Sequence, residues 1–163
     1  MTYIKQIFNS RILKAGVSTV GNVGTGEDDL QTYTLPASTL IATGDSVKIE
    51  AQYVIVNNAN QKRIKLFFGS ATLFDTGATG LAVSVSYSIN VQARVFKDGT
   101  NTQRYTVTYS ATPSSGTAIL GTSYGTTTQT DTSTITIKGT GETNAASNDD
   151  VTMPTLFVKL DLI

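Results

Sequence analysis

The residues of this chain that could do chemistry are carboxylates, and they cluster at two places. The first cluster comprises Glu27, Asp28 and Asp29, and the second comprises Asp149 and Asp150. Two carboxylates are enough for glycoside hydrolysis, and neighbouring carboxylates offer the oxygen ligands that Ca²⁺ prefers. No motif joins the clusters, however, and the spacing of an EF-hand loop is absent. Solvated turns explain both more simply, so we expect no enzyme, metal or cofactor, with Ca²⁺ at the first cluster as the alternative.

The residue types that carry most familiar mechanisms are missing. The 163 residues include no histidine and no cysteine. The chain therefore lacks the commonest general base and metal ligand, and it has neither a disulfide nor a thiolate. The glycines at residues 21–26 follow a G-x-x-G-x-G spacing, and the acidic residues after them would repel a phosphate. This run is therefore not a phosphate-binding loop.

Charge and hydropathy exclude two classes of partner. Lys and Arg together number 12, as do Asp and Glu, so the formal net charge is zero. Nucleic-acid binding needs a basic excess that this chain lacks. No apolar run approaches the roughly 20 residues of a membrane-spanning helix, and polar residues interrupt the first 11 positions where a signal peptide would be apolar. We expect neither a nucleic acid nor a membrane as partner.

The elements that position these residues are predicted to be β-strands. Within residues 82–96, apolar and polar side chains alternate from Val83 to Val95, which gives a long strand one apolar and one solvent-facing side. Such a strand needs paired neighbours and an apolar layer over its dry face. About eight strands are expected from Ser46 onward. The pattern predicts an all-β fold, a two-sheet antiparallel jelly-roll β-sandwich, with an immunoglobulin-like sandwich as the alternative.

The individual strands follow from the same alternation and from turn residues. Residues 57–60, 69–70 and 97–100 are predicted turns, and residues 139–150 a polar loop. The last strand is apolar enough to be central in a sheet. The predicted strands are residues 30–35, 46–55, 63–68, 72–75, 82–96, 103–110, 117–120, 134–138 and 151–163.

Residues 1–20 are predicted to be an N-terminal arm with at most one short helix, ahead of a domain at residues 21–163. Two interpretations of the arm's apolar residues stay open. They cover an edge of the domain's own core, or they dock on another subunit. The candidate partner-binding residues of the arm are Tyr3, Ile4, Ile7 and Phe8.

Residues 21–37, GNVGTGEDDLQTYTLPA, resemble a segment of virion proteins of tailed bacteriophages. TGDS at 43–46, NNAN at 57–60 and LFFG at 66–69 follow it as in those proteins, so the resemblance covers about residues 21–77. It implies a small jelly-roll domain that decorates the capsid, forms a head fibre or belongs to a tail fibre, often as a homotrimer, with capsid or fibre proteins as partners. The absence of a shaft-like repeat favours the head. The resemblance assigns no functional residue.

The alternative function is a carbohydrate-binding module of a tail fibre or adhesin, with a host glycan as ligand. Sugars are often held between aromatic rings and amide or carboxylate groups. Tyr105 and Tyr109 share a strand face with Val107, which favours core packing. Tyr124, in a predicted Gly/Thr-rich loop, is the candidate glycan-binding residue. The sequence thus favours a virion structural protein and keeps glycan recognition as the second interpretation.

Overall fold

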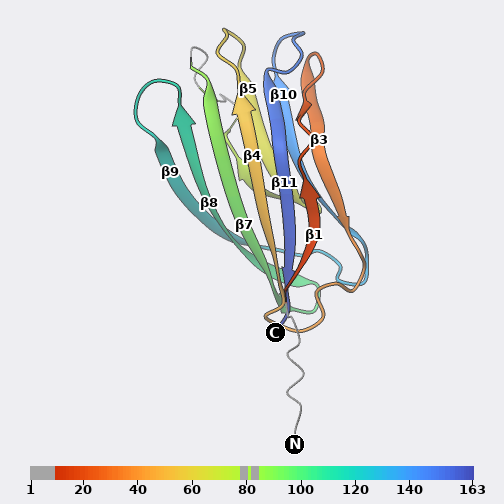
Figure 1. The fold of residues 1–163 in the computed structure, drawn as a ribbon. Coiled ribbons are helices and arrows are strands. Elements are labelled where there is room, and N and C mark those ends of the chain that lie inside the picture. The colour runs from red at the N-terminus through yellow and green to blue at the C-terminus, as the bar shows by residue number, and fades with distance from the viewer. Residues whose placement is uncertain (1–9, 78–80, 82–84) are drawn as a thin grey trace, which may run out of the picture.

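The structure, a computed structural model, describes residues 10–77, 81 and 85–163. Within these ranges the regular elements are strands in two sheets (Figure 1). The larger sheet contains β1 (Ser10–Gly16), β2 (Val20–Gly21), β4 (Ser46–Ile55), β7 (Tyr87–Gly99), β8 (Thr102–Pro113), β9 (Ile119–Thr127) and β11 (Val151–Asp161). The smaller sheet contains β3 (Gly26–Leu35), β5 (Lys62–Phe68), β6 (Ala71–Asp75) and β10 (Ile135–Thr143).

The strands pass between the two sheets as in a jelly roll. The larger sheet has the order β1-β11-β4-β7-β8-β9, with β2 also on β11, and the smaller sheet has the order β3-β10-β5-β6. The pairs are antiparallel. This confirms the predicted all-β, two-sheet antiparallel jelly-roll sandwich. The strands from Ser46 onward are β4 to β11, in agreement with the expected count of about eight.

The core lies between the sheets and follows the predicted alternation. In β4, the buried residues Val47, Ile49, Ala51, Tyr53 and Ile55 alternate with the more exposed Lys48, Glu50, Gln52 and Val54. The Tyr53 hydroxyl donates a 2.8 Å hydrogen bond to a backbone oxygen of the smaller sheet, so its polar end is satisfied. Burial raises the pKa of Tyr53. The sandwich is therefore held by a closely packed apolar interior with its polar atoms paired.

Several predicted elements are confirmed with their neighbours. β4 has the predicted bounds, and β7 and β8 form the predicted hairpin. β5 and β6 are joined across Gly69 and Ser70, as the turn residues indicated. β11 lies between β1 and β4 and is central in the larger sheet. These strands have one buried face each, so the period-two signal was strong.

The longest predicted strand is displaced along the chain. β7 runs from Tyr87 to Gly99 instead of from 82 to 96. Residues 82–84 lie outside the described residues, and Val85 and Ser86 are not in a strand. At its other end β7 continues through the predicted turn by means of a register shift between Lys97 and Gly99. A β-bulge of this kind lets a strand absorb residues that read as a turn.

Three segments that were predicted as loops lie wholly or partly in strands with polar outer faces. The acidic residues 27–29 belong to β3, and residues 139–143 belong to β10, which pairs with β3 and β5. Tyr124 lies in β9, which is nine residues long where only residues 117–120 were expected as a strand. Glycine and threonine weaken the apolar alternation at these places, and pairing with neighbouring strands overrides it.

Part of the predicted N-terminal arm belongs to the sandwich. Residues 10–16 form β1, which pairs with β11 so that Ser10 lies opposite Asp161 near the C-terminus (Figure 1). The expected partner-binding residues Tyr3, Ile4, Ile7 and Phe8 lie outside the described residues. No helix in the described part of the chain is long and apolar enough to cross a membrane.

Candidate functional site

The first acidic cluster is divided among separate partners. Glu27 accepts hydrogen bonds from Lys65 at 2.5 Å and Thr140 at 2.7 Å. Asp29 pairs with Lys138 at 2.7 Å, while Asp28 accepts the backbone N–H of Val23 at 2.8 Å. Among residues 10–77, 81 and 85–163, no three acidic residues gather as a metal site would require. Glu27 and Asp29 therefore tie β3 to the adjacent β10 and, across it, to β5, while Asp28 holds the turn before β3.

The Glu27 carboxylate is held in its charged form. Partial burial acts to raise its pKa, but the hydrogen bonds from Lys65 and Thr140 and the nearby lysine charges outweigh burial and lower it. A general acid needs a pKa raised toward neutrality. The lowered pKa of Glu27 therefore suits an ion pair and does not suit a general acid.

The second cluster contains a buried structural carboxylate that sequence reasoning missed. Asp150 is 2% exposed and accepts hydrogen bonds from four side chains. The donors and distances are Asn58 at 2.6 Å, Asn60 at 2.7 Å, Ser147 at 2.9 Å and Thr143 at 3.2 Å. These donors come from the β4–β5 connection and from the chain leading into β11. Asp150 thus joins two loops at one end of the sandwich.

Lys62 completes this arrangement from the start of β5. It is 1% exposed and donates hydrogen bonds to the backbone oxygen of Asn58 at 3.0 Å and to the Asn58 side-chain oxygen. Burial lowers the pKa of Lys62, while the nearby charge of Asp150 acts to raise it. Because every partner comes from the protein itself, this network holds loops together and presents no free group to a substrate.

A second carboxylate, whose side chain is 10% exposed, lies between other connections. Asp131 pairs with Lys97 and accepts hydrogen bonds from the Asn101 N–H and the Gln103 side chain, both at 2.8 Å. For Asp131 as for Asp150, burial acts to raise the pKa, and the hydrogen bonds outweigh it so that the pKa is lowered. In the folded state both groups therefore stay ionised below their ordinary pKa of about 4.

These two shifts predict a loss of stability in acid. Since the folded-state pKa values are lowered, the stabilisation is complete above the unfolded pKa of about 4 and disappears as the pH falls through the folded values. Thermal unfolding recorded from neutral pH downward should show a melting temperature that falls below about pH 4. Asp150→Asn should flatten this dependence, and an unchanged slope in that variant would contradict the assignment.

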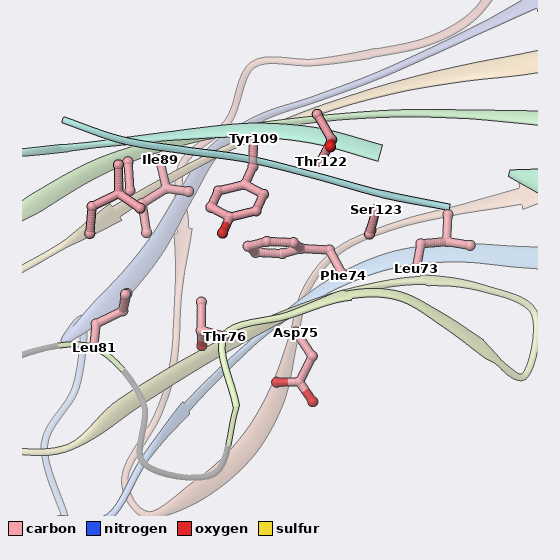
Figure 2. A pocket seen from close by; sticks show the side chains of 11 residues that line it. Leu73, Phe74, Asp75, Thr76, Leu81, Ile89, Tyr109, Thr122 and Ser123 are labelled. Carbon is pink, nitrogen blue, oxygen red and sulfur yellow. The ribbon is translucent and has the colours of Figure 1, made fainter. Parts of the chain in front are cut away.

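An apolar cleft lies at one edge of the sandwich (Figure 2). β8 and β9 extend the larger sheet past β7, while β6, the last strand of the smaller sheet, lies opposite β8. The cleft between them has a volume of about 420 Å³. The apolar side chains that line it are Leu73, Phe74, Leu81, Ile89, Tyr109, Ala111 and Ile119.

Aromatic rings from both sheets meet inside this cleft. Figure 2 shows Tyr109 of the larger sheet directed toward Phe74 of the smaller one. Their ring centroids are 4.9 Å apart, and the ring planes are tilted by 51°. Asp75 borders the cleft, but its carboxylate is held by Arg63 at 2.5 Å. The cleft is thus an apolar surface without a free charged group among its described residues.

The strand that forms the outer rim of the cleft is β9. A Cβ atom on Gly121 would lie 2.3 Å from the Tyr109 ring, and one on Gly125 would lie 2.5 Å from the Tyr105 hydroxyl. These glycines therefore let tyrosine rings of β8 lie across β9. Tyr105 and Tyr109 pack against the core, as expected from their shared face with Val107.

The exposure predicted for Tyr124 is confirmed, although the residue lies on a strand. Its side chain is 87% exposed, and it alternates with Ser123 and Gly125, which face the cleft side. Leu120, the second residue of β9, is 75% exposed on the same outer face as Tyr124. The outer face of β9 therefore presents two large side chains to solvent.

No protein-family model and no curated protein matches this chain.

Proposed function

We propose that this chain is a structural component of a bacteriophage virion that attaches to a capsid or fibre protein and associates with itself as a homotrimer. Capsid decoration or a head fibre is the favoured position. The phage assignment rests on the resemblance of residues 21–77 to tailed-phage virion proteins. The self-association rests on the edge of the larger sheet.

The observation that carries this proposal is the edge formed by β9, which pairs only with β8 among the strands that the structure describes. Its sequence, Ile119–Thr127, contains no charged residue and no proline. Such residues normally protect an edge strand from pairing with another chain. Beside this edge lies the apolar cleft, which exposes surface that a partner would bury. An edge of this kind is suited to a permanent protein contact.

A closed trimer requires two different contact patches on each copy, because a cyclic interface of three is heterologous. The β9 edge and the cleft lie at one end of the strand order of the larger sheet, and β1 lies at the other. The apolar N-terminal residues Tyr3, Ile4, Ile7 and Phe8 precede β1 in the chain. We propose that these residues contact the neighbouring copy or the particle. Each copy then offers two different contact patches, namely the N-terminal residues and the β9 edge with its cleft.

The state of the carboxylates supports a structural role over catalysis. Glu27 and Asp29 form ion pairs with lysines, and Asp150 is saturated by side-chain donors. Each of these groups stabilises the sandwich.

Sedimentation of the full chain tests the self-association. We expect a trimer at micromolar concentration, and we expect Ser123→Lys to weaken it at least tenfold because a charge would enter the partner contact. Thr106→Lys, on the outer face of the adjacent strand, is the matched control and should leave the trimer intact. A wild-type chain that stays monomeric at all concentrations would contradict the proposal.

Reattachment to particles tests the virion assignment. Purified chain is mixed with particles of the encoding phage that lack it, and bound copies are counted after sedimentation. We expect saturable binding that is lost when residues 1–9 are removed. If the complete chain leaves the particles bare, the proposed attachment is wrong.

A further inference from the structure

We propose that the outer face of the larger sheet contains a binding site for a neutral oligosaccharide, centred on Asn90 and Gln92. Two adjacent depressions share these two residues. Their volumes are about 250 Å³ and about 90 Å³. This inference does not depend on the phage assignment, because it concerns a different face from the β9 edge and the apolar cleft.

The residues of the site form two rows that run across the strands. The first row contains Gln52, Asn90 and Ser110, which are register partners on β4, β7 and β8. Thr155 on β11 and Leu120 on β9 continue it at either end. This row crosses four strand spacings of about 4.8 Å, or roughly 19 Å in all. The length suits a chain of a few sugar units.

The second row lies one repeat further along the same face. It contains Glu50, Gln92 and Thr108, again as register partners on β4, β7 and β8. The two rows together form a track, which we call the amide track, of the six residues Gln52, Asn90, Ser110, Glu50, Gln92 and Thr108. They alternate along their strands with residues that face the core, so the track is on the opposite face from the interior.

The amides of the track are free to bind a ligand. Within residues 10–77, 81 and 85–163, the side chains of Gln52, Asn90 and Gln92 make no hydrogen bond to another residue. Buried amides elsewhere are engaged by the fold, as in the bonds of Gln31 to Met153 and of Gln103 to Asp131. Three contiguous amides on one face therefore offer donors and acceptors that the fold does not consume.

The chemistry of the track favours a neutral sugar. Each amide presents both a donor and an acceptor, which matches sugar hydroxyls, since these also donate and accept. The single charged residue, Glu50, is paired with Lys48 at 2.8 Å. A phosphate or an acidic chain would find no unpaired cation within the track.

The orientation of the track argues against a peptide strand as its occupant. Extended peptides bind by adding to a sheet edge, where backbone groups are free. The strands under the track have neighbours on both sides, so their backbone groups are paired with each other. The track offers side chains only. Tyr124 lies on the same outer face beyond Thr122, where an aromatic ring could extend the site for a longer glycan.

The test is binding of the full chain to a printed array of neutral bacterial and animal glycans, followed by titration of the best ligand. Asn90→Ala combined with Gln92→Ala should weaken binding about thirtyfold, since two hydrogen-bonding side chains are lost. Asn57→Ala combined with Gln61→Ala removes the same two residue types from an exposed loop outside the track and should leave the affinity unchanged. Thermal unfolding of both variants verifies that they are folded.

Three results would overturn the inference. The first is an array on which no neutral glycan binds. The second is equal affinity in the wild-type chain and the track variant. The third is self-association that is lost in the track variant while no glycan is bound, because the face would then be a contact between copies. Sedimentation of Ser123→Lys tests the proposed β9 contact separately. It therefore distinguishes self-association through the track from a failure of the proposed trimer.

Discussion

Replacing Asp150 with alanine is expected to lower the free energy of unfolding by about 3 kcal/mol. The variant removes a buried acceptor from Asn58, Asn60 and Ser147 at once. It also removes the negative charge that favours the ionised form of the buried Lys62. These partly buried donors lose their acceptor together, so the effect exceeds that of one hydrogen bond. Urea unfolding monitored by circular dichroism measures it.

Asp98→Ala is the matched control for this prediction. Asp98 also forms a hydrogen-bonded ion pair, with Arg104 at 2.8 Å, but the two side chains are 42% and 68% exposed. Surface pairs of this kind contribute little, so the control should change stability by less than about 1 kcal/mol. Equal effects of the two alanine variants would show that the Asp150 network does not hold the loops together.

Replacing Gly139 with alanine is expected to destabilise the sandwich by about 2 kcal/mol. A Cβ at this position in β10 would lie 2.5 Å from the Tyr53 hydroxyl and 2.6 Å from the Met153 sulfur. Both neighbours are fully buried, so they have little space in which to move. The added methyl would also restrict the unfolded chain, which favours folding by less than about 1 kcal/mol. The steric cost is therefore larger than this gain, and the net effect is destabilising.

A second substitution distinguishes crowding from a general weakening of β10. Met153→Ala opens space beside Gly139, so the double variant should be more stable than the sum of the two single effects predicts. Thr136→Ala, on the exposed face of the same strand, should change stability by about 0.5 kcal/mol or less. If Gly139→Ala were as stable as the wild type, the close approach of the two sheets at this glycine would be wrong.

The sequence was most informative where one face of a strand is buried and the other is exposed to solvent. β4 alternates without exception around Ile49 and Ala51, and its bounds were predicted correctly. β11 has buried residues at Leu156, Val158 and Leu160, and its central position followed from its apolar character. In such strands a shift by one residue would expose the whole core face, so the pattern determines the register of the strand.

Elements whose stability comes from their neighbours could not be predicted in the same way. β9 has little apolar alternation of its own, because Gly121 and Gly125 are covered by tyrosine rings from β8. Residues 30–35 of β3 were predicted as a strand, but residues 26–29 were read as part of an acidic loop, since Glu27 and Asp29 find their lysine partners on strands that are distant in sequence. Cross-strand partners of this kind are visible only once the sheet order is known.

The candidate sites show the same division. The core packing of Tyr105 and Tyr109 followed from their spacing with Val107. Tyr124 is exposed as expected, but the loop on which that expectation rested is the strand β9. The Asp150 network and the amide track did not, because each gathers residues from several strands or loops. Gln52 and Asn90 are 38 positions apart in sequence and become neighbours only through the pairing of β4 with β7. The amides of β4 and β7 alternate with apolar residues, which indicates a polar strand face but does not indicate a binding site.

The composition of purified particles tests the central claim, that this chain is a virion component, most directly. Peptides of the chain are quantified by mass spectrometry in particles of the encoding phage, relative to the major shell protein. The account predicts a fixed number of copies per particle that is a multiple of three. A chain that is abundant in the lysate and absent from the purified particles would contradict it.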